Sequence, residues 1–205
     1  GYGPAPLSEN ELLFLSELKT YNPFAMPKWL EEAINNQQLI ESLHEQAPFD
    51  IRINSLKNTR DIVLKELIAE GFDATETPLS PVGIRLGKRQ PLNTHNLWKD
   101  GTLEVQDEAS QIVGLLCNAK PGMQVLDYCA GAGGKSLSIA ASMQNKGNLI
   151  LSDIYQHRLQ RAKERLRRAG VTSYQIKDIS IDSSWFKRQH KRFDRVLVDA
   201  PCTGT

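Results

Sequence analysis

A glycine-rich run is the part of this sequence best suited to binding a small molecule: Asp127-Tyr128-Cys129-Ala130-Gly131-Ala132-Gly133-Gly134-Lys135-Ser136. It lies between an expected strand and an expected helix, where open α/β sheets bind nucleotides at the carboxyl ends of their strands. A phosphate-binding loop would need glycine in place of Cys129, and a dinucleotide-binding loop starting at Gly131 would need glycine in place of Ser136. The run therefore predicts a different loop, in which the backbone approaches a ligand closely.

Three aspartates stand at the ends or edges of successive expected strands. Asp127 precedes the glycines, Asp153 ends a strand at 148–153, and Asp178 follows a strand at 174–176. A carboxylate at Asp153 can accept both hydroxyls of a ribose, and one at Asp178 is placed to meet an adenine amino group. One such aspartate is usually an ordinary turn residue. Three of them at successive strand ends favour a binding site whose ligand is a nucleoside that carries an amino acid. The sequence therefore predicts S-adenosylmethionine as the cofactor.

A second motif that can do chemistry ends the fourth expected strand of this region, at 194–199: Asp199-Ala200-Pro201-Cys202-Thr203-Gly204-Thr205. Carbon 5 of cytosine is a poor nucleophile, and a thiolate that bonds to carbon 6 makes it reactive enough to attack a methyl group. The carboxylate of Asp199 can hydrogen-bond the base and offset developing charge. The alternative for a cysteine is a small buried hydrophobe, which is our interpretation of Cys117. For Cys129 we expect packing or backbone contact beside the cofactor loop.

Residues 101–205 alternate strands and helices, which predicts a parallel sheet with right-handed crossovers and an α/β, Rossmann-like fold. We expect four strands before the chain ends and helices between them. The expected strands are 124–127, 148–153, 174–176 and 194–199, and the expected helices include 103–118 and 156–169.

Residues 1–100 predict a separate, small α+β domain that is rich in helix. A capping box at Ser8-Glu9-Asn10-Glu11 predicts a first helix. A second helix is expected from Pro27 through Leu43, a strand at 49–54, and a third helix at 59–70 that ends at Gly71. Prolines and glycines in 74–101 predict short strands and loops up to a boundary near residue 100.

Composition excludes several classes of protein. The 205 residues are 40% apolar and 24% charged, values of a globular protein and not of a disordered or fibrous one. No apolar run approaches the roughly 20 residues that span a membrane. The three cysteines, at 117, 129 and 202, share no metal-ligand spacing, and an odd number does not make a disulfide framework. We therefore expect a cytoplasmic protein with no metal site.

The small net charge of +1 conceals an asymmetry. Residues 1–100 carry ten basic and fourteen acidic side chains, whereas residues 101–205 carry fifteen basic and ten acidic ones. A polyanion such as RNA would therefore meet the second half. Basic groups gather on helix 156–169 and, among aromatic residues, in segment 185–195, where aromatic rings can stack on unpaired bases. For the helix, the simpler interpretation is that its arginines face water.

Three motifs together resemble the Sun-type (Nol/Nop/Sun) RNA cytosine-5 methyltransferases, with the closest likeness to the bacterial small-subunit ribosomal RNA enzymes. They are Gln106-Asp107-Glu108-Ala109-Ser110, the glycine-rich run and the Asp199–Thr205 motif, and the resemblance covers residues 22–205, including Ile51-Arg52-Ile53-Asn54. One departure is Gly131-Ala132, where many members of the family have alanine and proline.

The resemblance implies a site, an activity and a partner. It implies methylation of carbon 5 of cytosine in RNA, in particular 16S ribosomal RNA, guided by the amino-terminal domain. Lys135 and Asp199 would face the cytosine. Cys202 would help to release the product, while the attacking cysteine would lie in a later Thr-Cys motif, so that this chain would lack its nucleophile and about three strands. The residues implied to contact S-adenosylmethionine are Cys129, Ala130, Gly131, Ala132, Gly133, Gly134, Lys135, Asp153, Asp178 and Asp199.

Two other functions compete with this hypothesis. One is a nucleotide- or RNA-binding module without catalysis, and the other is an oxidoreductase built on a Rossmann sheet. The incomplete dinucleotide-binding loop and the Asp199-Ala200-Pro201-Cys202 motif argue against the oxidoreductase.

Overall fold

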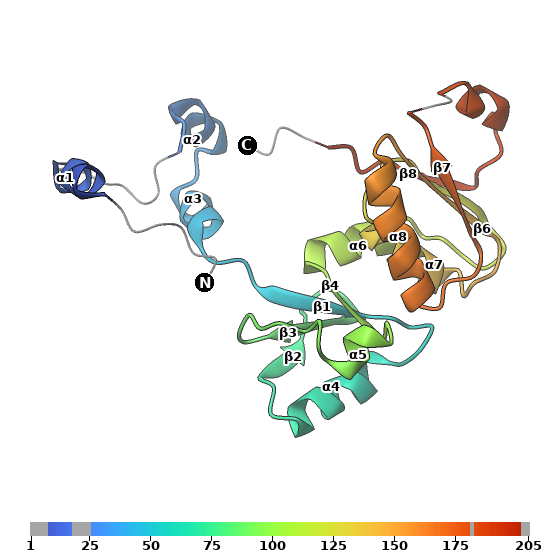
Figure 1. Ribbon diagram of the computed structural model, residues 1–205, viewed down its shortest axis with the longest axis horizontal. Helices are drawn as coiled ribbons and strands as arrows, with labels where there is room; N and C mark the ends of the chain where they lie inside the picture. Colours follow the sequence, from blue (N-terminus) through green and yellow to red (C-terminus); the bar gives the residue numbers. More distant parts are fainter. Residues whose placement is uncertain (1–7, 18–25, 181–182, 202–205) are drawn as a thin grey trace. The chain divides into compact units, whose positions relative to one another are not determined.

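The structure, a computed structural model, describes residues 8–17, 26–180 and 183–201, within which lie two four-stranded sheets (Figure 1). The chain divides after Ala47 into two units, 1–47 and 48–205, and both sheets belong to the second unit. Within the described residues, no helix is both long enough and apolar enough to cross a membrane.

The first unit contains the helices α1 (Glu9–Glu17), α2 (Lys28–Ile34) and α3 (Gln37–His44). The predicted capping box is confirmed, since the backbone N–H of Ser8 donates to the Glu11 carboxylate at 2.7 Å. The prediction of one helix from Pro27 through Leu43 is wrong. Asn35 adopts a left-handed conformation (φ 44°) that ends α2, and the side chain of Asn36 accepts a hydrogen bond from the N–H of Leu39 that begins α3.

The antiparallel sheet has the strand order β2-β3-β1-β4. Its centre is β1 (Phe49–Ile53), which pairs with β3 (Gly83–Leu86) on one side and with β4 (Leu103–Val105) on the other, while β2 (Ala74–Glu76) pairs with β3. Helices α4 (Arg60–Ala69) and α5 (Asn96–Lys99) contact this sheet. Ile51, Leu67 and Leu103 are fully buried in the core that forms between them. The predicted strand at 49–54 and helix at 59–70 are confirmed.

The expected helix at 103–118 is in fact a short strand followed by a shorter helix, α6 (Glu108–Leu116). Residues 103–105 form β4 because they pair with β1, in the register Ile51 with Val105. The helix begins only where Asp107 caps it, with its carboxylate accepting from the N–H groups of Ala109 (2.9 Å) and Ser110 (3.3 Å).

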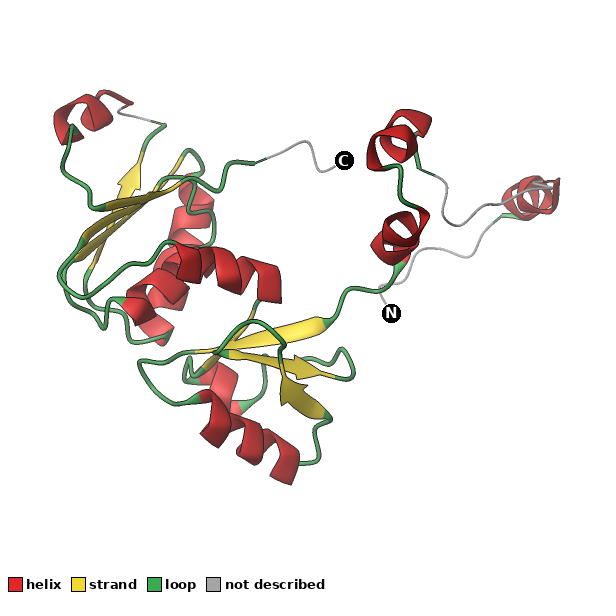
Figure 2. Cartoon of the chain, turned by 180° about the vertical axis from the view of Figure 1, so that it is seen from behind, coloured by secondary structure: helices red, strands yellow, loops and turns green. Residues whose placement is uncertain are grey.

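The second sheet is parallel, with the strand order β7-β6-β5-β8. Its strands are β5 (Gln124–Asp127), β6 (Asn148–Asp153), β7 (Tyr174–Asp178) and β8 (Arg195–Leu197). Helix α6 contacts α7 (Gly134–Ser142), and α7 contacts α8 (Gln156–Arg168), so the three helices pack together along this sheet (Figure 2). A 3₁₀ helix, η1 (Ser183–Gln189), follows β7. The predicted Rossmann-like parallel sheet, preceded by a small α+β region, is confirmed.

One buried amide joins the residues beside the antiparallel sheet to the carboxyl end of α8. The side chain of Asn54, 3% exposed, donates to the carbonyls of Gly101 (2.9 Å) and Ala169 (2.8 Å). The ammonium of Lys57 donates to the carbonyls of Asp100 and Arg168. The last carbonyls of a helix have no donor inside the helix. Residues that follow β1 therefore cap the carboxyl end of α8.

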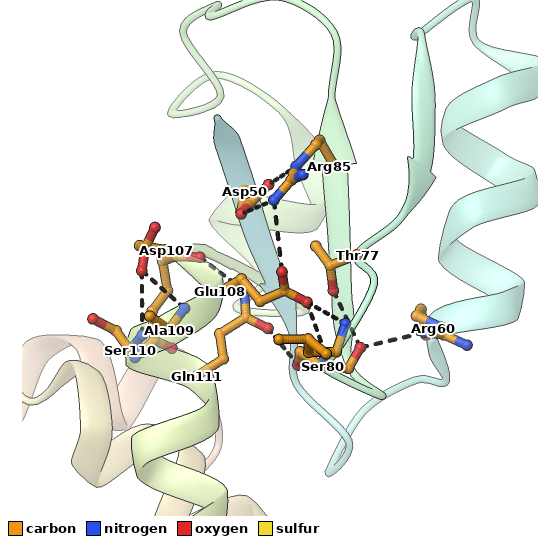
Figure 3. A network of polar contacts seen from close by, with 12 residues as sticks. Asp50, Arg60, Thr77, Ser80, Arg85, Asp107, Glu108, Ala109, Ser110 and Gln111 are labelled. Carbon is orange, nitrogen blue, oxygen red and sulfur yellow. Dashed lines mark hydrogen bonds and ion pairs between the residues drawn. The ribbon is translucent and has the colours of Figure 1, made fainter. Parts of the chain in front are cut away.

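A polar network fixes the first turn of α6 to the antiparallel sheet (Figure 3). The Glu108 carboxylate accepts from the backbone N–H groups of Leu79 (2.6 Å) and Ser80 (2.8 Å), and it lies 3.6 Å from the Arg85 guanidinium. Arg85 also donates to both carboxylate oxygens of Asp50, at 2.8 and 3.0 Å. Charge-assisted bonds of this kind are shorter and stronger than bonds between neutral groups. The domain boundary near residue 100 stays a prediction, and the antiparallel sheet continues through β4 to Val105.

Candidate functional site

The glycine-rich loop joins β5 to α7 and has glycine at two positions whose backbone conformation other residues rarely adopt. Gly131 and Gly133 both have positive φ, 53° and 80°. A Cβ at Gly133 would lie 2.9 Å from the Cβ of Ala162 on α8, so the loop touches this helix directly. A Cβ at Gly131 would meet nothing within 4 Å. The loop is therefore packed against α8 on one side and open on the other.

A cavity of about 480 Å³ opens beside this loop. It extends over the carboxyl ends of β6 and β8, where a doubly wound sheet holds its ligand. The cavity lies within the size range of pockets for small molecules. Its lining comprises Tyr128, Cys129, Ala130, Gly131, Ala132, Asp153, Ile154, Tyr155, Arg158, Ile179, Asp199, Ala200 and Pro201.

Asp153 supplies a hydrogen-bond acceptor to this lining. Its Oδ2 accepts from the N–H of Gly131 at 2.8 Å, and its Oδ1 accepts from the N–H of Tyr155 at 2.8 Å. Each carboxylate oxygen has a second lone pair, so both can still accept a hydroxyl from a ligand. The residue thus fixes the loop and presents free acceptor capacity to the cavity.

A second cavity, of about 270 Å³, adjoins the first. Three residues, Cys129, Ala130 and Asp199, line both. The smaller cavity is strongly polar, since its other lining residues are Val105, Gln106, Asp107, Ser110, Asp127, Gly134, Lys135 and Arg165. The Nζ of Lys135 donates to Oδ2 of Asp199 at 2.5 Å, joining the start of α7 to the residues after β8. The structure therefore brings Lys135 and Asp199 together at the smaller cavity, and Asp199 also lines the larger one.

Asp127 lies beneath the smaller cavity and is 2% exposed. Burial raises the pKa of its carboxyl to about 6, although a hydrogen bond from Ser136 Oγ at 2.6 Å favours the ionised form. Nearby Lys135 also favours the ionised form, and the charges of Asp199 and Asp153 oppose it. Asp127 organises the base of the loop through its bond to Ser136 in the first turn of α7.

The described cysteines are not activated. Burial raises the pKa of the Cys129 thiol, and the carboxylates of Asp153, Asp127 and Asp199 raise it further. Burial likewise raises the pKa of Cys117. Cys129 lines both cavities, and Cys202 lies outside the described residues. In the parts of the chain that the structure describes, no three His, Cys, Asp or Glu side chains gather as a metal site would require.

Asp178 stands apart from the other predicted cofactor residues. It ends β7 directly opposite Asp153 in the sheet. However, its Oδ1 accepts from the N–H and the hydroxyl of Ser180, at 2.9 and 2.5 Å, and it lines a different cavity, beside Gln156 and Tyr174. The neighbouring Ile179 lines the 480 Å³ cavity instead. The contact of Asp178 with a cofactor stays a prediction.

Several lining residues were not singled out from the sequence. Ile154 and Ile179 follow β6 and β7 and supply apolar surface that a planar base can contact. Arg158 lines the same cavity, and its guanidinium lies 4.9 Å from the centre of the Tyr155 ring. The signal for the two isoleucines was position, since each directly follows an aspartate at a strand end. For Arg158, the helical pattern indicated only a water-facing arginine.

The lysine and arginines of α8 other than Arg158 divide into two groups. Arg161, Lys163 and Arg167 are exposed, as expected for a face in water. Arg165 and Arg168 instead turn toward the antiparallel sheet, where both pair with Glu104. In the segment at 185–195, the Phe186 ring lies 5.0 Å from the ring of Tyr128, which lines the larger cavity. Aromatic residues of this segment therefore lie near the site.

Comparisons with known proteins agree with this architecture. Residues 115–205 match the protein-family model described as 16S rRNA methyltransferase RsmB/F. Residues 26–93 match the model described as a Methyltr_RsmF/B-like, ferredoxin-like domain. Together these two models cover most of the chain.

Individual relatives are similar over most of this chain. It is 34% identical over 154 residues to the probable ribosomal RNA small subunit methyltransferase B of Bacillus subtilis, covering 75% of this chain and 34% of that protein. It is 33% identical over 198 residues to the ribosomal RNA small subunit methyltransferase B of Shewanella oneidensis, covering 93% and 44%. The chain thus spans less than half the length of these relatives.

A solved structure of a methyltransferase homologue protein from Pyrococcus horikoshii is 27% identical, with a TM-score of 0.74. The match covers 97% of this chain and 65% of that one. NSun6 from the same organism, solved with SFG, shares the fold at 19% identity and a TM-score of 0.76, over 88% and 72% of the two chains. The matched domain models, the relatives and the shared fold lead to one conclusion: the chain belongs to the Sun-type, RsmB/F family of methyltransferases.

Proposed function

We propose that the protein containing this chain transfers a methyl group from S-adenosylmethionine to carbon 5 of a cytosine in small-subunit ribosomal RNA. The observation that carries the proposal is the Lys135–Asp199 pair, which lines the smaller of two adjoining cavities and reaches the larger one through Asp199. One cavity suits a nucleoside cofactor and the other, smaller and polar, suits a base. The names of the curated relatives support ribosomal RNA as the substrate.

The residues of the 480 Å³ cavity fit S-adenosylmethionine. The free lone pairs of Asp153 suit the ribose hydroxyls, and Ile154 and Ile179 suit the faces of an adenine. The open side of Gly131 lets a ligand approach the backbone. When bound there, the cofactor supplies a methyl group carried on a sulfonium. We assign its contacts to Cys129, Ala130, Gly131, Ala132, Gly133, Gly134, Lys135, Asp153, Asp178 and Asp199.

The pair Lys135 and Asp199 would act on the cytosine. Addition of a thiolate to carbon 6 of the base places negative charge on the ring, and a neighbouring ammonium such as that of Lys135 offsets it. Asp199 holds that ammonium at 2.5 Å and can accept a hydrogen bond from the amino group of the base. We assign Cys202 to the release of product, and the attacking thiolate to a cysteine beyond this chain, both on the family resemblance.

Methyl transfer to unmodified 16S ribosomal RNA tests the proposal. The protein is incubated with S-adenosylmethionine labelled in its methyl group, and the RNA is digested and mapped by mass spectrometry. We expect 5-methylcytosine at one position. Methylation of another atom would overturn the assignment to carbon 5. Tight RNA binding without any methyl transfer would favour the alternative of a binding module.

Asp153→Ala should weaken the binding of S-adenosylmethionine by roughly 1–3 kcal/mol, the cost of leaving buried polar partners unpaired. The variant removes the acceptor for the ribose and also frees the N–H groups of Gly131 and Tyr155. Calorimetry on the full-length protein measures the change. Unchanged affinity, or a wild-type protein that prefers NADH or ATP, would refute the cofactor assignment.

A further inference from the structure

The glycine-rich loop has a second attachment that reaches it from the antiparallel sheet. The carbonyl of Ala132 accepts a hydrogen bond from Nη1 of Arg165 at 2.8 Å. Nη2 of the same guanidinium donates to Oε2 of Glu104, on β4, at 3.0 Å. One planar side chain on α8 thus links a strand of the antiparallel sheet to the loop of the parallel sheet.

Ala132 is the residue of the loop that most needs such a link. It lies between Gly131 and Gly133, which both adopt the left-handed conformation. Glycines gain more conformational freedom than other residues when they are released, so a loop with this sequence has little stiffness of its own. Asp153 restrains the loop at Gly131, and Arg165 restrains it one residue later. Because Ala132 lines the larger cavity, its position sets the shape of that cavity.

Glu104 decides where Arg165 points. It is 4% exposed and pairs with both Arg165 and Arg168. Arg52, 2% exposed, lies opposite Glu104 in the pairing of β1 with β4. Burial lowers the pKa of Arg52, the charge of Glu104 raises it, and the charge of Arg165 lowers it. One carboxylate therefore attracts all three guanidinium groups and offsets part of their mutual repulsion. Without it, the mutual repulsion of the cluster would drive Arg165 toward the solvent.

We propose that Arg165 is a positioning residue for the cofactor: oriented by Glu104, it holds the carbonyl of Ala132 and so keeps the glycine-rich loop in its binding conformation. This inference rests on the proposed function and assigns part of cofactor binding to the antiparallel sheet. A guanidinium is required because its fork reaches two acceptors at once, which an ammonium on a flexible stem does not.

The test measures binding of S-adenosylhomocysteine by calorimetry, with the full-length protein. Arg165→Met should weaken binding by about tenfold, the size of one lost charge-assisted hydrogen bond. Arg165→Lys and Glu104→Gln should each cost several-fold, and Glu104→Gln should add no further loss to Arg165→Met, because the two residues act in series. The matched controls Arg161→Met and Arg167→Met lie on the exposed face of the same helix and should bind like the wild type.

Steady-state kinetics separate positioning from general destabilisation. The KM for S-adenosylmethionine should rise in Arg165→Lys by a larger factor than kcat at saturating cofactor falls. Wild-type affinity in Arg165→Met, equal losses in the control variants, or additive losses in the double variant would each overturn the inference. If Arg165→Met does not fold, the lysine variant decides by the same criterion. A wild-type protein that fails to bind S-adenosylhomocysteine would instead overturn the proposed function.

Discussion

Asp199→Asn should lower kcat for methyl transfer by roughly 10²–10⁴-fold, the range that positioned acid–base groups contribute. The variant keeps the shape of the side chain but removes the charge that holds the Lys135 ammonium, 2.5 Å away. It also weakens the acceptor that we assign to the amino group of cytosine. Because Asp153 and the loop are unchanged, the affinity for S-adenosylmethionine should fall much less than kcat. Single-turnover assays with 16S ribosomal RNA measure the chemical step.

Asp194→Asn is the matched control for this variant. Asp194 precedes the same strand, β8, at its opposite end, where its carboxylate accepts from the N–H of Gln124 at 2.8 Å. The same substitution there should change kcat by no more than a few-fold. Lys135→Met should reproduce the loss seen in Asp199→Asn, and the double variant should lose little more, since the two groups act as a unit. Full activity in Asp199→Asn would remove this pair from the mechanism.

Asp127→Asn should remove a pH-dependent part of the free energy of unfolding. Its size is on the order of 3 kcal/mol, because the pKa of this carboxyl is raised to about 6 in the folded protein. A folded-state pKa above the unfolded value means that the protonated carboxyl stabilises the fold. That contribution is fully present below about pH 4 and is lost as the pH rises through about 6. Relative to Asp127→Asn, the wild type should therefore gain stability as the pH falls from 7 to 4.5. Urea unfolding of both proteins over this range measures the difference.

Ser136→Ala provides a second arm for this experiment. The Ser136 hydroxyl donates to Asp127 at 2.6 Å and favours the ionised carboxylate. Its removal should raise the pKa of Asp127 and so move the pH-dependent change in stability to higher pH. A general loss of repulsion between carboxylates would move this change to lower pH. If the stability of the wild type and of Asp127→Asn changes in parallel with pH, the prediction is wrong. Other interactions would then offset the cost of burying the ionised carboxylate, and its pKa would not be raised.

Local patterns in the sequence predicted much of the fold. After residue 120, apolar strands alternate with amphipathic helices, and local residues mark where the helices begin and end. Gly133 precedes α7, and Gly170 follows α8. These features involve residues that are close in the chain, so they can be read without knowing the partners. The same holds for the capping box at Ser8. The positions of Asp153 and Asp199 at strand ends followed from the topology, because parallel strands bring their carboxyl ends to one edge.

What the sequence did not predict depends on distant partners. The three residues of β4 were assigned to a helix, because only their pairing with β1, some fifty residues earlier, makes them a strand. Arg165 was placed among the water-facing arginines of α8, because its two acceptors, Glu104 and Ala132, lie on other elements. The division between α2 and α3 was missed for a different reason, since Asn35 and Asn36 can occupy a helix as well as cap one.

The cap on α8 has a consequence for the order in which the protein folds as it is synthesised. The amide of Asn54 and the ammonium of Lys57, which satisfy the last carbonyls of this helix, leave the ribosome about one hundred residues before the helix does. The antiparallel sheet is complete at Val105 and needs no later strand for its pairing. The emerging α8 thus meets a finished docking surface, so the amino-terminal sheet acts as an internal template on which the later Rossmann-like sheet is assembled.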